Sequence, residues 1–154
     1  MFKRVLFFAM VLVMISAVAN AAPRLALGSA TESSDSVVIP LIFISDKSSG
    51  VAALGIDISY AADALEVPSV EIGPSASAAG KNISLSNPST GIASLGFFGF
   101  NTTAIGDGVV AVLTFRKKMA VINEKLNFGY SSYGANSEGD DVVMDKSDTI
   151  LTVE

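Results

Sequence analysis

The stretch GIDISYAADALEV, residues 55–67, decides the fold class of this chain. Large apolar side chains occupy every second position from Leu54 to Tyr60, and the residues beside them are small or polar: Ala53, Gly55, Asp57 and Ser59. Successive side chains of a β-strand point to opposite faces, so this period of two predicts a strand with one packed face and one small, polar face. The AADA sequence at 61–64 then predicts a turn, after which Leu65 and Val67 start the next strand.

The remaining sequence divides into short apolar runs separated by Gly, Pro, Ser, Asn and Asp. The predicted strands are Arg24 to Ala30, Val37 to Ser45, Val51 to Tyr60, Leu65 to Ile72, Lys81 to Leu85, Gly91 to Phe100, Val109 to Arg116, Lys125 to Tyr133, and two pieces between Val142 and Val153. Their lengths and turn-rich spacing favour an all-β sandwich or barrel over alternating βα units. No segment has a sustained helical period, and Ala76 to Ala79 is expected to be the loosest segment.

Two of these runs are apolar on both faces. Val109 to Phe115 has no polar face, which predicts a central strand. The run VVIPLIFI at 37–44 is also apolar throughout but contains Pro40. Proline cannot donate to a strand ladder, so Pro40 is expected at an edge, at a bulge or at a switch between sheets.

The first 21 residues have the layout of a secretory signal peptide. Lys3 and Arg4 precede an apolar run from Val5 to Val18, and small residues follow at Ala19 and Ala21. Fourteen apolar residues are fewer than the roughly 20 that a membrane-spanning helix needs, so we expect cleavage after Ala21, with Ala19 as the second candidate. The secreted domain is then expected over residues 22–154, in the periplasm or outside the cell. Loss of the two basic residues leaves eight Lys and Arg against fifteen Asp and Glu, a net charge of −7. This acidity argues against nucleic acid as a partner, because that binding needs cationic groups.

The composition also limits the chemistry. The chain has no His and no Cys, so neither a Ser-His-Asp nor a Cys-His arrangement is available, and a zinc site of the usual ligand types is excluded. The acidic residues lie in or near turns, where solvated charges are expected in place of a catalytic pair. The sequence therefore predicts no enzyme, no catalytic residue and no metal site or cofactor. Calcium is the one metal left open, since oxygen ligands from a loop suffice; the candidates are Asn136, Glu138, Asp140 and Asp141.

Four stretches together resemble the cohesin domain, in the order found in that family. They are LALGSATESSDSVVIPLIF at 25–43, GVAALGIDISYAADALEV at 50–67, GIASLGFFGF at 91–100 and AIGDGVVAVLTFRKK at 104–118. The resemblance implies a nine-stranded jelly-roll β-sandwich, a fold that is also similar to bacterial cellulose-binding modules. It further implies a receptor for a dockerin, a small calcium-loaded helical module, through the outward face of the strand at 51–60. The positions where dockerin-binding cohesins place a polar and an acidic residue fall here on Ala53 and Gly55, and Asp57 is the remaining polar candidate.

A second part of the candidate partner-binding surface is aromatic. In the run 91–100, Phe98 alternates with Phe97, so a regular strand points one of them away from the core. The predicted outward set includes Phe98 and Phe100, which would favour a protein contact. A bulge at Gly99 that turns the side chains inward is the alternative.

The predicted function is a secreted, non-catalytic interaction module that binds a protein partner, dockerin-like or other. The alternative is a carbohydrate-binding module that recognises a polysaccharide directly. Flat polysaccharides are usually gripped by an aromatic platform, whereas this chain has no Trp and three Tyr. Tyr60 is expected in the core, and Tyr130 and Tyr133 are expected on opposite faces of one strand. Protein binding therefore ranks above glycan binding.

Overall fold

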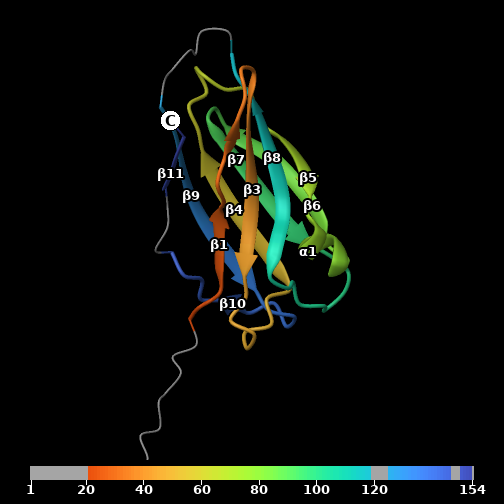
Figure 1. Ribbon diagram of the computed structural model, residues 1–154. Helices are drawn as coiled ribbons and strands as arrows, with labels where there is room; N and C mark the ends of the chain where they lie inside the picture. The colour runs from red at the N-terminus through yellow and green to blue at the C-terminus, as the bar shows by residue number, and fades with distance from the viewer. Residues whose placement is uncertain (1–20, 119–124, 147–149, 154) are drawn as a thin grey trace, which may run out of the picture.

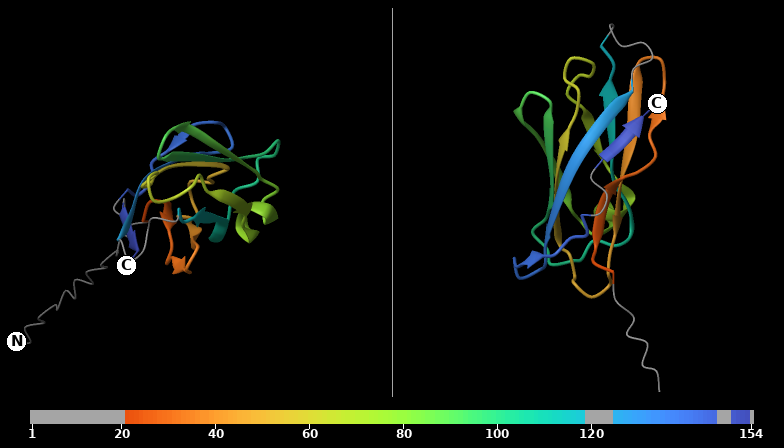
Figure 2. Two further views of the ribbon diagram at one scale, coloured as in Figure 1. Left: turned by 90° about the horizontal axis from the view of Figure 1, so that it is seen from above. Right: turned by 90° about the vertical axis from the view of Figure 1, so that its left-hand side faces the viewer.

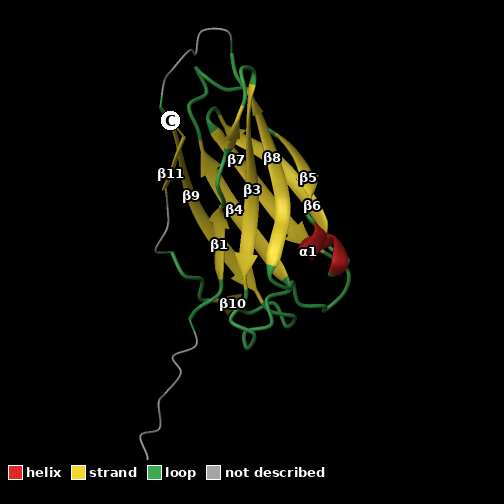
Figure 3. Ribbon diagram, viewed as in Figure 1, coloured by secondary structure: helices red, strands yellow, loops and turns green. Residues whose placement is uncertain are grey.

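The computed structural model describes residues 21–118, 125–146 and 150–153, and the predicted signal peptide therefore lies almost wholly outside the described residues. The described chain forms two antiparallel sheets packed face to face, with one short helix (Figures 1 and 3). Viewed from above in Figure 2, the two sheets lie as two layers. The predicted all-β sandwich is confirmed.

The first sheet has five strands, with neighbours in the order β1-β3-β8-β5 and with β2 paired to β3. Its strands are β1 (Arg24–Leu27), β2 (Thr31–Glu32), β3 (Ser36–Ile44), β5 (Ser69–Ile72) and β8 (Gly108–Arg116). Strand β8, predicted to be central, lies between β3 and β5, and it pairs with β3 along nearly its whole length.

The second sheet has six strands, with neighbours in the order β10-β9-β4-β7-β6 and with β11 paired to β9. Its strands are β4 (Ala53–Ser59), β6 (Asn82–Ser89), β7 (Ile92–Phe98), β9 (Leu126–Ala135), β10 (Asp141–Val142) and β11 (Ile150–Val153). The described residues thus form eleven strands, where the sequence pattern predicted ten and the resemblance implied nine. Two of the eleven, β2 and β10, are only two residues long.

The core lies between the two sheets and is rich in phenylalanine. Four Phe side chains are fully buried: Phe43, Phe97, Phe115 and Phe128. Phe115 on β8 crosses the gap between the sheets, with its ring centroid 5.2 Å from that of Tyr60 and 5.0 Å from that of Phe128. Tyr60 directly follows β4 and Phe128 lies on β9, so both rings come from the six-stranded sheet. The rings of both pairs are tilted against each other, a favourable geometry for aromatic contacts.

Strand β4 follows the sequence prediction residue by residue. Leu54, Ile56, Ile58 and, beyond the strand, Tyr60 are buried in the core. The AADA segment does turn the chain, since the N–H groups of Ala64 and Leu65 both donate to the carbonyl of Ala61. The next strand, however, begins at Ser69 and not at Leu65, which forms only an isolated bridge with Lys117.

Pro40 lies at an interruption of the strands beside β3, where its carbonyl accepts a hydrogen bond from the Gly28 N–H. β1 ends at Leu27, opposite Leu41, and β2 begins at Thr31, opposite Val38, so Pro40 faces the break between these two short strands. The β3–β8 register shifts between Leu41 and Ile42, one residue further on. Of the three settings predicted for Pro40, an edge, a bulge or a switch between sheets, this irregularity beside it fits the bulge best.

The prediction that Ala76 to Ala79 is the loosest segment was wrong. Helix α1 (Pro74–Ala78) occupies this segment, and Ala76 and Ala79 are buried. The Gly73 N–H donates to the carbonyl of Val110, and the Ser75 hydroxyl donates to that of Asp107, so β8 holds the turn in place. A five-residue helix is too short to show a helical period in the sequence. No helix among the described residues has the length and hydropathy to cross a membrane.

Replacing Phe115 tests the aromatic bridge between the sheets. We expect Phe115→Ala to lower the free energy of unfolding by about 3–5 kcal/mol, because it leaves a cavity between two packed layers. Urea denaturation followed by tyrosine fluorescence measures the change. The control is Val143→Ala at an exposed site, expected to stay within about 0.5 kcal/mol of the parent. Equal stability of the two variants would contradict this description of the core.

Candidate partner-binding face

The outward side of the six-stranded sheet brings together most of the predicted site residues. We call this surface the outer face; its members alternate with the core residues of β9, β4, β7 and β6. They are Ser131, Tyr133 and Ala135 on β9, Ala53, Gly55, Asp57 and Ser59 on β4, Ser94, Gly96 and Phe98 on β7, and Asn82, Ser84 and Ser86 on β6. Gly55 lies between Tyr133 and Gly96, and Asp57 lies between Ser131 and Ser94.

The aromatic ring of Tyr133 rests on Gly55. A Cβ atom built on Gly55 would lie 1.9 Å from Cε2 of Tyr133 and 2.2 Å from its Cζ, distances that no side chain can occupy. The Tyr133 ring therefore lies across strand β4 and buries Gly55, while 53% of Tyr133 itself stays exposed. Glycine at this position thus makes room for Tyr133 at the centre of the outer face.

Asp57 is the acidic group at the centre of the outer face. Its Oδ1 accepts a hydrogen bond of 2.5 Å from the hydroxyl of Ser94 on β7. The pKa of Tyr133 is raised, first because the ring is partly buried and second because the negative charge of Asp57 disfavours the phenolate. Asp57 and Tyr133 are therefore electrostatically coupled neighbours on one surface.

The two predicted aromatic residues both point away from the core. Phe97 is buried, Phe98 is 48% exposed on the outer face, and Phe100, just beyond β7, is fully exposed. The strand stays regular through Phe98, so the alternative of a bulge at Gly99 was wrong.

The loop that carries Phe100 is braced by a buried lysine that the sequence did not single out. Lys81 is only 4% exposed, and its Nζ donates to Oδ1 of Asn101 at 2.7 Å and to the Asn101 carbonyl. Burial lowers the pKa of Lys81. The Asn101 amide donates in turn to the carbonyls of Ala79 and Gly80. These bonds tie the Phe100 loop to the end of helix α1, so Phe100 is presented by a fixed backbone.

The candidate calcium residues lie elsewhere, in the loop between β9 and β10. Oδ1 of Asn136 accepts hydrogen bonds from the backbone N–H groups of Glu138 and Asp140, so this oxygen closes the turn. Among the described residues, no group of three or more acidic side chains is placed to hold a metal ion.

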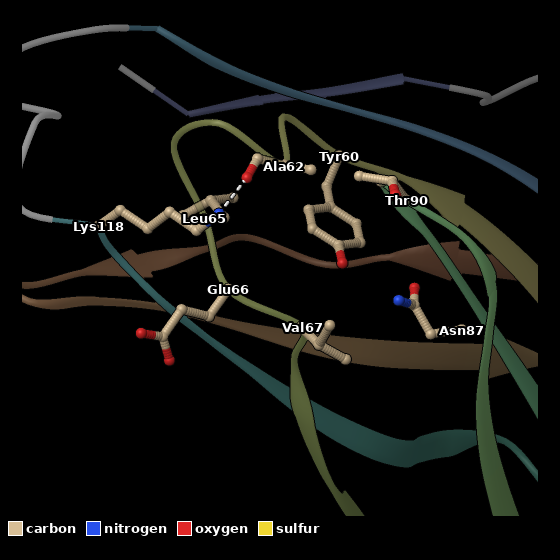
Figure 4. Close-up of a pocket in the computed structure, with 9 residues that line it drawn as sticks. Tyr60, Ala62, Leu65, Glu66, Val67, Asn87, Thr90 and Lys118 are labelled. Atoms are coloured by element: carbon tan, nitrogen blue, oxygen red, sulfur yellow. Dashed lines mark hydrogen bonds between the residues drawn. The ribbon is translucent and has the colours of Figure 1, made fainter.

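A separate cleft opens at one end of the sandwich (Figure 4). It has a volume of about 370 Å³ and lies between the turn at 61–67 and the β6–β7 turn. The hydroxyl of Tyr60 points into it, and the exposed side chain of Val67 forms part of its wall. Lys118, at its rim, donates to the carbonyl of Ala62 and so closes the turn. The predicted site residues do not line this cleft.

Comparison with known proteins identifies the family. The model of the cohesin domain family matches residues 24–151. The chain belongs to the cohesin family. Among curated proteins, no sequence matches this cohesin.

Solved cohesins share its fold. The sixth cohesin of scaffoldin B from Acetivibrio cellulolyticus, solved in complex with a Cel5 dockerin mutant, is 25% identical, with a TM-score of 0.66 over 81% of this chain and 94% of that one. The cohesin module of a family 33 glycoside hydrolase from Clostridium perfringens has a TM-score of 0.70 at 10% identity, over 87% and 96% of the two chains. A non-cellulosomal cohesin from Archaeoglobus fulgidus has a TM-score of 0.63 at 17% identity, over 80% and 85%. At these identities, the last two show the fold alone.

Titration of Tyr133 tests the arrangement at Gly55. In Gly55→Ala the new methyl group must push the ring off strand β4, so we expect the pKa of Tyr133 to fall toward its ordinary value as the ring becomes solvated. NMR of tyrosine labelled at Cζ measures the titration.

The matched control is Gly96→Ala on the neighbouring strand. Its Cβ would lie 3.1 Å from the Ser84 hydroxyl and would not contact Tyr133, so the tyrosine pKa should stay at the parent value. An unchanged Tyr133 titration in Gly55→Ala would show that the ring does not rest on Gly55.

Proposed function

We propose that this cohesin is an exported, non-catalytic receptor that binds a dockerin-like helical protein on its outer face. The observation that carries the proposal is the surface around Gly55 in a chain of the cohesin family. The Tyr133 ring covers Gly55, and Gly96 on the next strand leaves a low surface beside Phe98.

The outer face suits a protein partner in its composition. Protein interfaces concentrate their binding energy in a few aromatic residues that neighbouring contacts shield from water. Tyr133, Phe98 and Phe100 are aromatic, largely exposed and held by the sheet or by the braced loop. Gly96 has no side chain, so it leaves space beside Phe98 for an apolar side chain of a partner helix.

The charge of the outer face indicates the chemistry of the partner. Asp57 is its one charged residue among the outward positions of β9, β4, β7 and β6. A partner with a basic residue opposite Asp57 and apolar residues around it would match this pattern. In the solved complex with the Acetivibrio cellulolyticus cohesin the partner is a dockerin, which supports the same class of partner here.

Direct recognition of a polysaccharide is the second candidate, and the exposed aromatic rings favour it. Tyr133 and Phe98 lie on strands separated by β4, roughly 9–10 Å apart across the sheet at the usual strand spacing. They are also offset along the strands, because Tyr133 is level with Gly96 and not with Phe98. They do not form a row along one strand, so a single sugar chain would meet them obliquely. Protein binding remains the better fit.

The test is affinity capture with the chain from residue 22 onward, the form that the predicted cleavage produces. It is immobilised with and without calcium and offered the periplasm and medium of the source organism, with insoluble cellulose as a parallel bait. We expect one protein with paired calcium loops to be captured. Asp57→Lys should weaken its binding at least about tenfold, because the change reverses the charge at the centre of the face.

The control places the same lysine on the other sheet. Ser69 on β5 is exposed and lies opposite Thr114 on the outward side of the five-stranded sheet, so Ser69→Lys should bind the partner as the parent does. Equal loss of partner binding in Asp57→Lys and Ser69→Lys would show a general effect of charge and not a site at Asp57. If the chain is retained on cellulose and captures no protein, the proposed protein binding is wrong and glycan binding takes its place.

A further inference from the structure

The β6–β7 hairpin and the loop after it carry no charge. Residues 82–106 contain none of the 25 charged residues of the chain, although charged residues make up 16% of it. This neutral segment includes β6, which among the described residues pairs only with β7 and so forms an edge of the six-stranded sheet.

A neutral edge strand is a site for pairing with another strand. Edge strands expose unpaired backbone N–H and C=O groups, and monomeric proteins usually protect them with charges, prolines or bulges. In β6 the protecting features lie at one end, with Pro88 and the register irregularity between Ser86 and Ser89. The first five residues, Asn82 to Ser86, pair regularly with β7 and have no such protection.

The sequence of this edge is complementary to itself. In an antiparallel pair of two β6 strands centred on Ser84, Ser84 lies opposite its own copy, Ile83 opposite Leu85, and Asn82 opposite Ser86. The polar pairs would lie on the outer face and the Ile–Leu pairs on the inner side, where both side chains are half-buried against the core. Such cross-strand pairs stabilise antiparallel strands.

Charge and apolar exposure favour a second copy as the occupant. Two chains with a predicted net charge of −7 repel each other over most of their surfaces, but not along this neutral edge. The neighbouring strand β5 is the edge of the other sheet, and Ile72 on it is 39% exposed. Pairing of the β6 edges would shield the Ile72 side chain from water.

We infer that this cohesin forms a weak, symmetric dimer in which β6 pairs antiparallel with β6 of a second copy. The two six-stranded sheets become one continuous sheet, and the two-fold axis stands perpendicular to it. Both outer faces then point to the same side. If the proposed function is right, the dimer is a receptor with two binding faces, whereas the dimer itself does not depend on that function.

Disulfide trapping tests the pairing directly, because the natural chain contains no cysteine. Ser84→Cys places one thiol on each copy at the two-fold axis, within the distance that a disulfide requires. Under oxidised glutathione, we expect the purified chain from residue 22 onward to form a covalent dimer at least about tenfold faster than Ser131→Cys. Ser131 is also an exposed serine of the outer face, but it lies on β9, away from the edge.

Sedimentation of the cysteine-free chain provides the second measurement. We expect a monomer–dimer equilibrium as the concentration rises from low micromolar toward millimolar, and loss of the dimer in Ser84→Lys, which places two ammonium groups opposite each other. Ser131→Lys should dimerise as the parent does. A monomer at every concentration would overturn the inference, as would a dimer that Ser84→Lys leaves intact or equal cross-linking of the two cysteine variants.

Discussion

The two-residue period of strand β4 is the constraint on which the rest of the structure depends. Because Leu54, Ile56 and Ile58 must be buried, the residues between them must face outward, and β4 lies between β7 and β9 in the sheet. A shift of one residue in its register would move Asp57 into the core and every large apolar side chain into water. The same alternation therefore fixes both the core and the position of the outer face.

Packing within the core made much of the fold predictable. Strands such as β4 and β8 have a strong pattern because one or both faces are buried, and burial is what selects the sequence there. The strand predicted from Leu65 was wrong because Leu65 is buried by the turn itself and makes a single bridge to Lys117. Helix α1 escaped prediction because contacts with β8 hold it, and those contacts join residues more than 30 positions apart.

The candidate site was only partly predictable for the same reason. Alternation predicted that Asp57 points outward, and that Phe98 does so unless a bulge at Gly99 turns it inward; both side chains point outward in the structure. Tyr133 was expected only to differ in face from Tyr130, since its place over Gly55 depends on the register between β4 and β9. The brace between Lys81 and Asn101 likewise depends on a loop-to-helix contact that no local pattern encodes. In the sequence, Gly55 indicates only that a side chain is missing from the outer face. In the sheet, the missing side chain leaves the space that the Tyr133 ring occupies.

The outer face of the six-stranded sheet is the proposed site for a protein partner. The most direct measurement is photo-crosslinking in the source organism, with a benzophenone amino acid in place of Phe98 and, as a control, in place of Thr114 on the outward side of the other sheet. We expect a protein adduct of one discrete mass from position 98 and none from position 114. An adduct from position 114 with none from position 98 would contradict the proposed site.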